Sequence, residues 1–296
     1  MQSFFSKNVF RSLIILLIFF NIPLQAKNIP TVFVSILPQK YFLQQIVKDR
    51  MDIRVMVQPG ASPATYEPSP LQMTHLSKAK IYFSIGVPFE SKWLPKISQL
   101  YPALKMIQTD RGIEKIPIHH HHHDHGEMAP PSIPDPHIWL SPPLVKIQAR
   151  HIWNSLQEID PDNRQFYEQQ YQLFLGRLNK LDDELRNTFF KYQHNAFMVF
   201  HPSWGYFAKA YGLRQMAIEI EGKDVKPRQL KQLIQKARDN HVRIIFAQPQ
   251  FSSKSAHLIA REISGQVVLI DPLALDWEEN LRNVAIQIRS ASKNLK

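Results

Sequence analysis

Histidines are concentrated in one internal stretch of the chain, PIHHHHHDHGEMAPPSIPDPHIWLSP, which runs from Pro117 to Pro142. Six of them fall within seven residues: His119, His120, His121, His122, His123 and His125. Imidazole is the commonest metal ligand in proteins, and His-rich tracts are typical of metal binding. A purification tag would lie at a terminus and would not be interrupted by Asp124. We therefore predict a disordered loop over 117–134 that binds metal ions weakly.

Three further residues could ligate a metal from separate elements. FMVF is followed by His201 and VVLI by Asp271, while His137 lies in DPHIWLSP, just before a predicted helix. In open α/β sheets, ligands gather at the carboxyl ends of strands. Each signal alone is weak, because a single His there is more often a structural hydrogen-bonding residue and an Asp before Pro is more often a turn residue. Together they predict that His137, His201 and Asp271 meet in one cleft.

The types of these side chains suggest which ion would bind. Two imidazoles and a carboxylate suit a borderline divalent ion such as Zn²⁺. Mn²⁺ would prefer more oxygen ligands, and Cu⁺ would prefer clustered Met and Cys. Glu219 and Glu221, at the end of MAIEIEG, are either partners that orient an imidazole or turn residues. Trp204, with its aromatic neighbours in WGYF, is expected to form core around the site.

The elements that must position these residues follow an alternating pattern. Short apolar runs predict strands at 31–37, 53–57, 81–86, 104–108, 197–200, 216–220, 243–248 and 267–270. Helical patterns lie between them at 41–49, 70–79, 89–100, 204–211, 227–240, 253–263 and 277–293. This alternation is typical of parallel sheets with helices on both faces. The predicted fold class is α/β, with two lobes, each a mostly parallel sheet flanked by helices.

One long helix is predicted between the lobes, over 160–192. Asp160 is expected to cap it, with Pro161 in its first turn. The apolar residues of its expected stripe are Phe166, Leu173, Phe174, Leu178, Leu181, Leu185 and Phe189. Some 30 helical residues would span about 45 Å. We predict a rigid helix that joins the lobes, with a coiled-coil segment as the alternative.

The first 26 residues differ from the rest. Lys7 and Arg11 precede the apolar run SLIILLIFFNIPL, and Ala26 ends the segment. This pattern indicates a secretory signal peptide, and the run is too short to favour a permanent membrane span. The mature chain would begin near Lys27. The expected parts are a signal peptide over 1–26, an N-terminal lobe over 27–159, the connecting helix over 160–192 and a C-terminal lobe over 193–296.

Charge and cysteine content narrow the class of protein. The chain has 36 Lys and Arg against 25 Asp and Glu, a formal net charge of +11. These basic residues are scattered and form no long basic block, which argues against a nucleic-acid partner. There is no cysteine, so neither a disulfide nor a lipid-bearing cysteine is available. We expect an unanchored, monomeric periplasmic protein.

Several segments resemble the zinc-uptake substrate-binding proteins of bacterial ABC importers. The likeness covers nearly the whole mature chain, in QPGASPATYEPSP, YFSIGVPFESKWLP, DPHIWLSPPLVKIQA, VFHPSWGYFAKAYGL, IEIEGKD, FAQPQFSSKSA and IDPLALDW. The resemblance implies an ion held between two lobes and delivered to an ABC permease in the inner membrane. His137, His201 and Asp271 match the family's two later histidines and its acidic ligand. Zinc-type members often carry an acidic, His-rich loop where this chain has 119–127.

The first ligand position departs from the family pattern. Members have a histidine in a segment like SPHTYEP, whereas this chain reads SPATYEP, with Ala64 in that place. Water, a loop histidine such as His121, or Glu67 could fill the gap. Three protein ligands with an open position are also the pattern of a catalytic zinc. The expected function is nevertheless a zinc receptor, as the resemblance implies, and not an enzyme.

Other classes of protein remain as alternatives to that expectation. A receptor of the same family for manganese or another divalent metal is one, and a zinc-dependent hydrolase is another. A surface adhesion or structural protein that needs metal only for folding is a third. The hydrolase is disfavoured because the chain has no HExxH or GxSxG motif.

Overall fold

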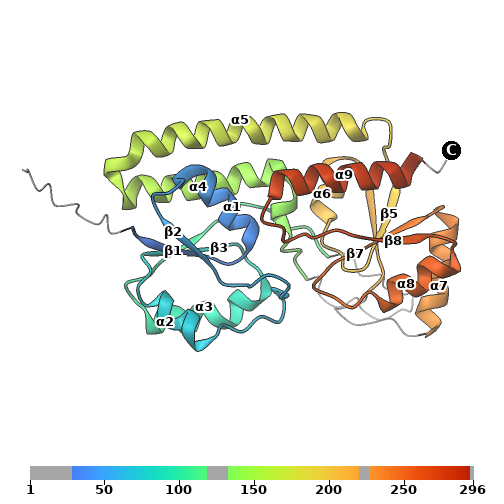
Figure 1. Cartoon of the computed structure of the whole chain (residues 1–296), viewed down its shortest axis with the longest axis horizontal. Coiled ribbons are helices and arrows are strands. Elements are labelled where there is room, and N and C mark those ends of the chain that lie inside the picture. The colour runs from blue at the N-terminus through green and yellow to red at the C-terminus, as the bar shows by residue number, and fades with distance from the viewer. Residues whose placement is uncertain (1–28, 119–132, 220–226, 294–296) are drawn as a thin grey trace, which may run out of the picture.

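The computed structural model describes residues 29–118, 133–219 and 227–293 (Figure 1). Its strands are β1 (Thr31–Val34), β2 (Asp52–Val55), β3 (Ile81–Ser84), β4 (Lys105–Gln108), β5 (Ala196–Val199), β6 (Arg214–Ala217), β7 (Ile244–Ala247) and β8 (Gln266–Leu269). Its helices are α1 (Leu37–Val47), α2 (Pro70–Leu76), α3 (Pro88–Leu100), α4 (Pro142–Ile159), α5 (Arg164–Phe189), α6 (Gly205–Ala210), α7 (Pro227–Asp239), α8 (Lys254–Glu262) and α9 (Trp277–Lys293). The short 3₁₀ helices are η1 (Ile138–Leu140) and η2 (Pro161–Asn163).

The strands form two parallel sheets of the same topology, one in each lobe. Their orders are β2-β1-β3-β4 and β6-β5-β7-β8, and every described pairing is parallel. The inner strands β3 and β7 are buried along their whole length. Helices cover both faces, which is why these strands read as continuous apolar runs. The α/β class with two lobes is confirmed.

Helix α5 runs along both lobes on one side of the molecule (Figure 1). It has 26 residues, a length of about 39 Å at 1.5 Å per residue. Its start differs from the prediction, because the 3₁₀ helix η2 intervenes and the helix begins at Arg164. The carboxylate of Asp160 accepts hydrogen bonds from the Asn163 amide and the Tyr167 hydroxyl, and not from a backbone N–H of α5.

The buried stripe of α5 packs on α4, α1 and α9. From Phe174 onward the stripe follows the predicted pattern, and Phe174, Leu178 and Phe189 are fully buried. Leu173 is 55% exposed, so its assignment to the stripe was wrong. Tyr171 is buried instead, and its ring stacks on Trp153 of α4 with centroids 4.9 Å apart. Near the start of α5, the buried positions of the stripe are thus occupied by the amphipathic residues Tyr167 and Tyr171.

One hydrophobic core is continuous between the two lobes. It includes Val34 of β1, Phe174 of α5 and Val199 of β5. At its centre, Phe42 of α1 contacts both Phe174 and Trp277, with ring centroids 6.2 and 5.0 Å apart. A second cluster lies between the C-terminal sheet and the helices α7 and α8. Because close-packed cores deform little, the shared core restricts movement of one lobe against the other.

The described helices include none that is long and apolar enough to cross a membrane. The expected signal peptide and the His-rich stretch 119–125 lie outside the described residues, as does Glu221.

Glu90 is a buried carboxyl in the N-terminal lobe, near the carboxyl end of β3. It accepts hydrogen bonds from the Ser35 hydroxyl and from the backbone N–H groups of Ile85 and Gly86, the last two at 3.0 and 2.7 Å. Burial raises the pKa of Glu90 to about 7, although these hydrogen bonds to the carboxylate act in the opposite direction. The folded protein therefore contains an internal acid that titrates near neutral pH.

We expect Glu90→Gln to remove a pH-dependent loss of stability. Because the folded pKa of about 7 lies above the ordinary 4.5, the folded state keeps a proton that the unfolded state has already released. The free energy of unfolding should therefore fall as pH rises from about 5 to 8, by up to roughly 3 kcal/mol relative to the variant. Glutamine can mimic the protonated acid, since its amide can donate to Ser35 while its oxygen accepts from Gly86.

Urea unfolding followed by circular dichroism at the two pH values measures this difference. Glu114→Gln, at an exposed carboxyl of the same lobe, is the control. A stability difference between wild type and Glu90→Gln that is the same at both pH values would contradict the assignment.

Candidate metal centre

His201 lies just beyond the end of β5, and its main chain is held by a side chain from the next strand. Its N–H donates to Oε1 of Gln248 at 3.1 Å, and Nε2 of Gln248 donates to the His201 carbonyl at 2.7 Å. Gln248 follows β7 and is 1% exposed. The buried amide of Gln248 thus bonds the main chain of His201 just beyond the ends of β5 and β7, and it fixes the position of the His201 backbone.

The imidazole of His201 is oriented by a buried carboxylate and an aromatic ring. Its Nδ1 lies 2.6 Å from Oε1 of Glu219, which follows β6. Its ring stacks on Phe251 with centroids 4.5 Å apart. Of the two roles that the sequence left open for Glu219, the geometry therefore favours orientation of an imidazole.

His137 lies immediately before η1 and has the same kind of partner. Oδ1 of Asp135 is 2.7 Å from Nδ1 of His137 and also accepts the His137 N–H at 2.9 Å. Asp135 is 2% exposed, so this carboxylate is a fixed part of the interior. The sequence analysis missed Asp135. An Asp two residues before a His, in DPH, can form both bonds locally, and this spacing is the signal that could have found it.

The structure brings His137 and His201 together, with their Nε2 atoms 3.3 Å apart. A carboxylate can only accept hydrogen bonds, so each Nδ1 carries the ring hydrogen. In the neutral rings, both Nε2 atoms then present lone pairs to each other. That arrangement is unfavourable unless the two nitrogens share a cation.

The available cations are a proton or a metal ion. Burial lowers the pKa of His201, and its neighbour His137 lowers it further, while Glu219 partly opposes both. The neutral form that a metal requires is therefore favoured. Two nitrogens about 2.0–2.1 Å from a tetrahedral ion lie roughly 3.3–3.4 Å apart. The observed separation of 3.3 Å fits that geometry.

Asp271 is not part of this pair in the structure. Its Oδ1 accepts hydrogen bonds from Nε2 of Gln250 at 2.7 Å and from the N–H of Leu273 at 2.8 Å. Among the described residues, no group of three or more His, Cys, Asp or Glu side chains is placed to hold a metal ion. Asp271 instead borders a cavity of about 80 Å³ whose walls come from both lobes, including Ile36 and Gly60.

The segments that carry His137 and Asp271 are nevertheless joined. Nε1 of Trp139, in η1, donates to the carbonyl of Pro272 at 2.7 Å. Nε1 of Trp277 donates in turn to the carbonyl of Trp139 at 2.8 Å. The main chain next to Asp271 is thus bonded to the turn that presents His137.

The remaining candidates lie apart from the pair or outside the described residues. Ala64 is exposed on the connection between β2 and α2. The carboxylate of Glu67 forms an ion pair with Lys92 at 2.5 Å, and its side chain is 64% exposed. His121 and the other loop histidines, within 119–125, fall in the segment that the structure does not describe. Trp204 and Phe207 are fully buried, as expected for core.

Comparisons with known proteins identify the family of this chain. A family model described as "Zinc-uptake complex component A periplasmic" matches residues 32–291. The high-affinity zinc uptake system protein ZnuA of Bacillus subtilis (strain 168) is 30% identical over 243 residues, which cover 80% of this chain and 76% of that protein. The manganese ABC transporter substrate-binding lipoprotein PsaA of Streptococcus pneumoniae is 26% identical over 254 residues. These residues cover 80% of this chain and 78% of that protein.

A solved structure supports the same conclusion. The crystal structure of ZnuA superposes with a TM-score of 0.82 at 43% identity, covering 89% of this chain and 99% of that chain. The matched family consists of metal-binding receptors, which excludes the zinc-dependent hydrolase considered from the sequence. With the family model matching most of its length, this chain belongs to the family of zinc-uptake component A, the metal-binding substrate-binding proteins of ABC transporters.

Proposed function

We propose that this protein captures Zn²⁺ in the periplasm and delivers it to an ABC permease in the inner membrane. The observation that carries the proposal is the pair of Nε2 atoms of His137 and His201, which face each other 3.3 Å apart with both Nδ1 atoms bound to carboxylates. Export would use a signal peptide over 1–26. The mature chain would act as a monomer of two lobes, 27–159 and 193–296, joined through 160–192.

Asp271 is proposed as the third ligand. Among the described residues, hydrogen bonds from Gln250 and Leu273 reach its Oδ1, and we assign its Oδ2 to the ion. The hydrogen bond from Trp139 to the carbonyl of Pro272 holds the neighbouring main chain against the His137 turn. A rotation of the Asp271 side chain, with a small closing movement of the lobes, would bring Oδ2 to the imidazole pair. The shared core argues against a larger movement.

A fourth ligand would come from water or from a loop histidine such as His121. Glu67 is less suited, because its carboxylate would first have to leave Lys92. The loop histidines of 119–125 would also collect ions weakly and raise their concentration near the cleft.

Zinc is proposed over manganese because of the donor atoms. Two imidazole nitrogens and one carboxylate oxygen suit Zn²⁺, whereas Mn²⁺ prefers more oxygen ligands. Binding would displace protons that compete for the imidazoles, so affinity should fall as the pH drops. Because burial lowers the pKa of His201, protons compete for this imidazole only at a lower pH.

The test is calorimetric titration of the metal-stripped mature protein with Zn²⁺ and with Mn²⁺, with and without residues 119–127. We expect one tight Zn²⁺ site that survives the deletion, weaker sites that disappear with it, and weaker binding of Mn²⁺. Tighter binding of Mn²⁺ than of Zn²⁺ would show that manganese is the cargo and not zinc. The absence of any tight site in both proteins would overturn the receptor function.

Glu219→Gln should weaken Zn²⁺ binding by about 10–100-fold, the range typical of partners that orient a ligand. The amide preserves the size of the side chain but not the charge that holds the Nδ1 hydrogen of His201. Glu262→Gln, an exposed carboxyl of the same lobe, is the matched control. Competition with a chelator of known affinity measures both variants, and equal affinities for the two would contradict the role given to Glu219.

A further inference from the structure

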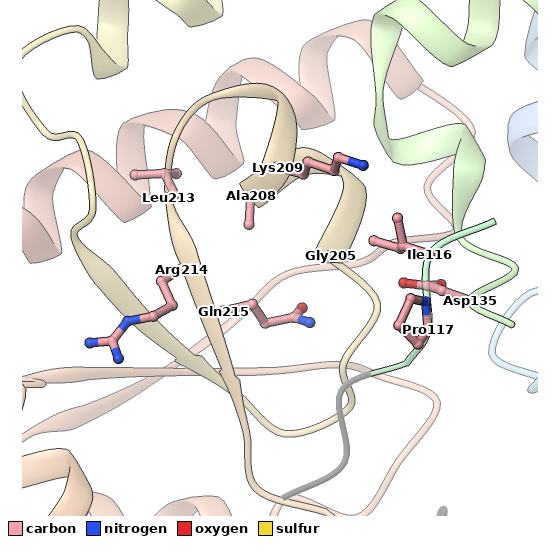
Figure 2. Close-up of a pocket in the computed structure, with 9 residues that line it drawn as sticks. All are labelled: Ile116, Pro117, Asp135, Gly205, Ala208, Lys209, Leu213, Arg214 and Gln215. Carbon is pink, nitrogen blue, oxygen red and sulfur yellow. The ribbon is translucent and has the colours of Figure 1, made fainter. Parts of the chain in front are cut away.

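A cavity of about 390 Å³ lies beside Asp135, between α6, β6 and the segment at Ile116 and Pro117 (Figure 2). Its wall includes Ile116, Pro117, Asp135 and Gly205. In Figure 2, Asp135 lies next to Ile116 and faces the start of α6 at Gly205. The carboxylate that orients His137 is therefore packed against the C-terminal lobe.

The hydroxyl of Tyr206 forms hydrogen bonds with the main chain of both Ile116 and Asp135. It accepts the N–H of Ile116 at 3.1 Å and donates to the carbonyl of Asp135 at 2.9 Å. The same two residues are joined directly, since the N–H of Asp135 donates to the carbonyl of Ile116 at 2.8 Å. Burial raises the pKa of Tyr206 to about 12, so the hydroxyl keeps the hydrogen that it donates. Tyr206 thus fixes the main chain of Asp135.

Gly205 leaves room for the side chain of Asp135. A Cβ atom at position 205 would lie 2.9 Å from Oδ2 of Asp135 and 3.4 Å from Cδ1 of Ile116. The first distance is shorter than a normal van der Waals contact. Any side chain at 205 would therefore displace the carboxylate, whose other oxygen contacts His137 at 2.7 Å.

We infer that Gly205 and Tyr206 are positioning residues for His137, acting through Asp135. They hold the carboxylate so that Nδ1 of His137 carries the hydrogen and Nε2 stays free for the ion. His201 lies on the same connection, between β5 and α6. One short segment of the C-terminal lobe therefore presents one imidazole directly and sets the tautomer of the other. The consequence for metal affinity rests on the proposed function, whereas the tautomer does not.

The first measurement is the ¹⁵N NMR spectrum of the imidazoles in the metal-free protein. The signals of His137 are assigned by their loss in His137→Gln. In wild type we expect Nδ1 of His137 to carry a hydrogen that Asp135 accepts, whether or not its Nε2 shares a proton with His201. In Gly205→Ala and Tyr206→Phe we expect a mixture of the two tautomers, because the carboxylate no longer holds the hydrogen there.

Matched controls separate positioning from general destabilisation. Tyr211→Phe, at the other end of α6, removes a buried hydroxyl that contacts Asp182 at 3.1 Å, far along the chain from Asp135. Gly176→Ala adds a Cβ in α5 that would meet no described atom within 4 Å apart from the neighbouring backbone of its own helix. Both controls should keep the wild-type spectrum of His137, even if Tyr211→Phe lowers stability as much as Tyr206→Phe.

The second measurement is Zn²⁺ affinity of the same variants. We expect both positioning variants to bind about 10-fold more weakly or worse, with the controls unchanged. A wild-type His137 spectrum in both Gly205→Ala and Tyr206→Phe would overturn the inference. A shifted tautomer in a protein that binds no Zn²⁺ tightly would support the inference and overturn the proposed function instead.

Discussion

Replacing His201 with alanine is expected to abolish high-affinity Zn²⁺ binding, with a loss of at least about 100-fold. An imidazole bonded to the ion contributes more than a partner that merely orients it, for which 10–100-fold is typical. The loss should be this large because Ala64 cannot coordinate an ion, so His137 and the proposed ligand Asp271 would have to hold it with water or a loop histidine. Isothermal titration or chelator competition measures the change.

The alanine variant also leaves Glu219 buried without its partner, so a second variant is needed in case it misfolds. His201→Gln keeps a donor for the carboxylate of Glu219 while replacing the ligand nitrogen, and it should lose affinity to a similar extent. His257→Ala removes an exposed histidine of α8 in the same lobe and serves as the control. Affinity of the folded His201→Gln protein within a few-fold of wild type would rule out the pair as the metal centre.

Restoring the family's first ligand with Ala64→His is expected to have the next largest effect. The added imidazole should tighten Zn²⁺ binding by at least about 10-fold, since it would complete a site of four protein ligands. The position is exposed on the β2–α2 connection, so the change costs little core packing. Gly60, on the same connection, faces the cavity that Asp271 borders.

A comparison with the loop deletion identifies what fills the fourth position in wild type. If a histidine of 119–125 supplies it, removing 119–127 should weaken the wild-type site but leave the Ala64→His site intact. If water fills it, the deletion should leave both affinities unchanged. An Ala64→His protein that binds no tighter than wild type, with or without the loop, would show that position 64 does not reach the ion.

Most of the fold could be predicted because the inner strands of its sheets are buried on both faces. Such strands are short apolar runs, and the observed strands begin or end within a few residues of the predicted ones. Helix α9 spans the residues expected for it, 277–293. The start of α1 was misplaced, because TVFVSIL was interpreted as a strand through Leu37. Pro38, in the first turn of the observed helix, was the overlooked signal.

The site was only partly predictable, for a physical reason. The sequence pattern predicted that His137 and His201 converge, and their Nε2 atoms lie 3.3 Å apart. No local pattern ranks the hydrogen bonds that compete for Asp271, and Gln250 and Leu273 bond to one of its oxygens. The role of Gly205 depends on how closely another segment approaches it, which no local pattern reveals.

The hydrogen-bonded chain from Trp277 through Trp139 to Pro272 gives the protein an optical reporter of its own. The Trp139 ring lies 5.1 Å from the His137 ring, centroid to centroid, and its indole N–H is fixed at the edge of the proposed cleft. A charge arriving at His137 would change the electric field at this indole. Intrinsic fluorescence should therefore follow cargo loading in real time, without any label, and Trp139→Phe should silence most of that signal.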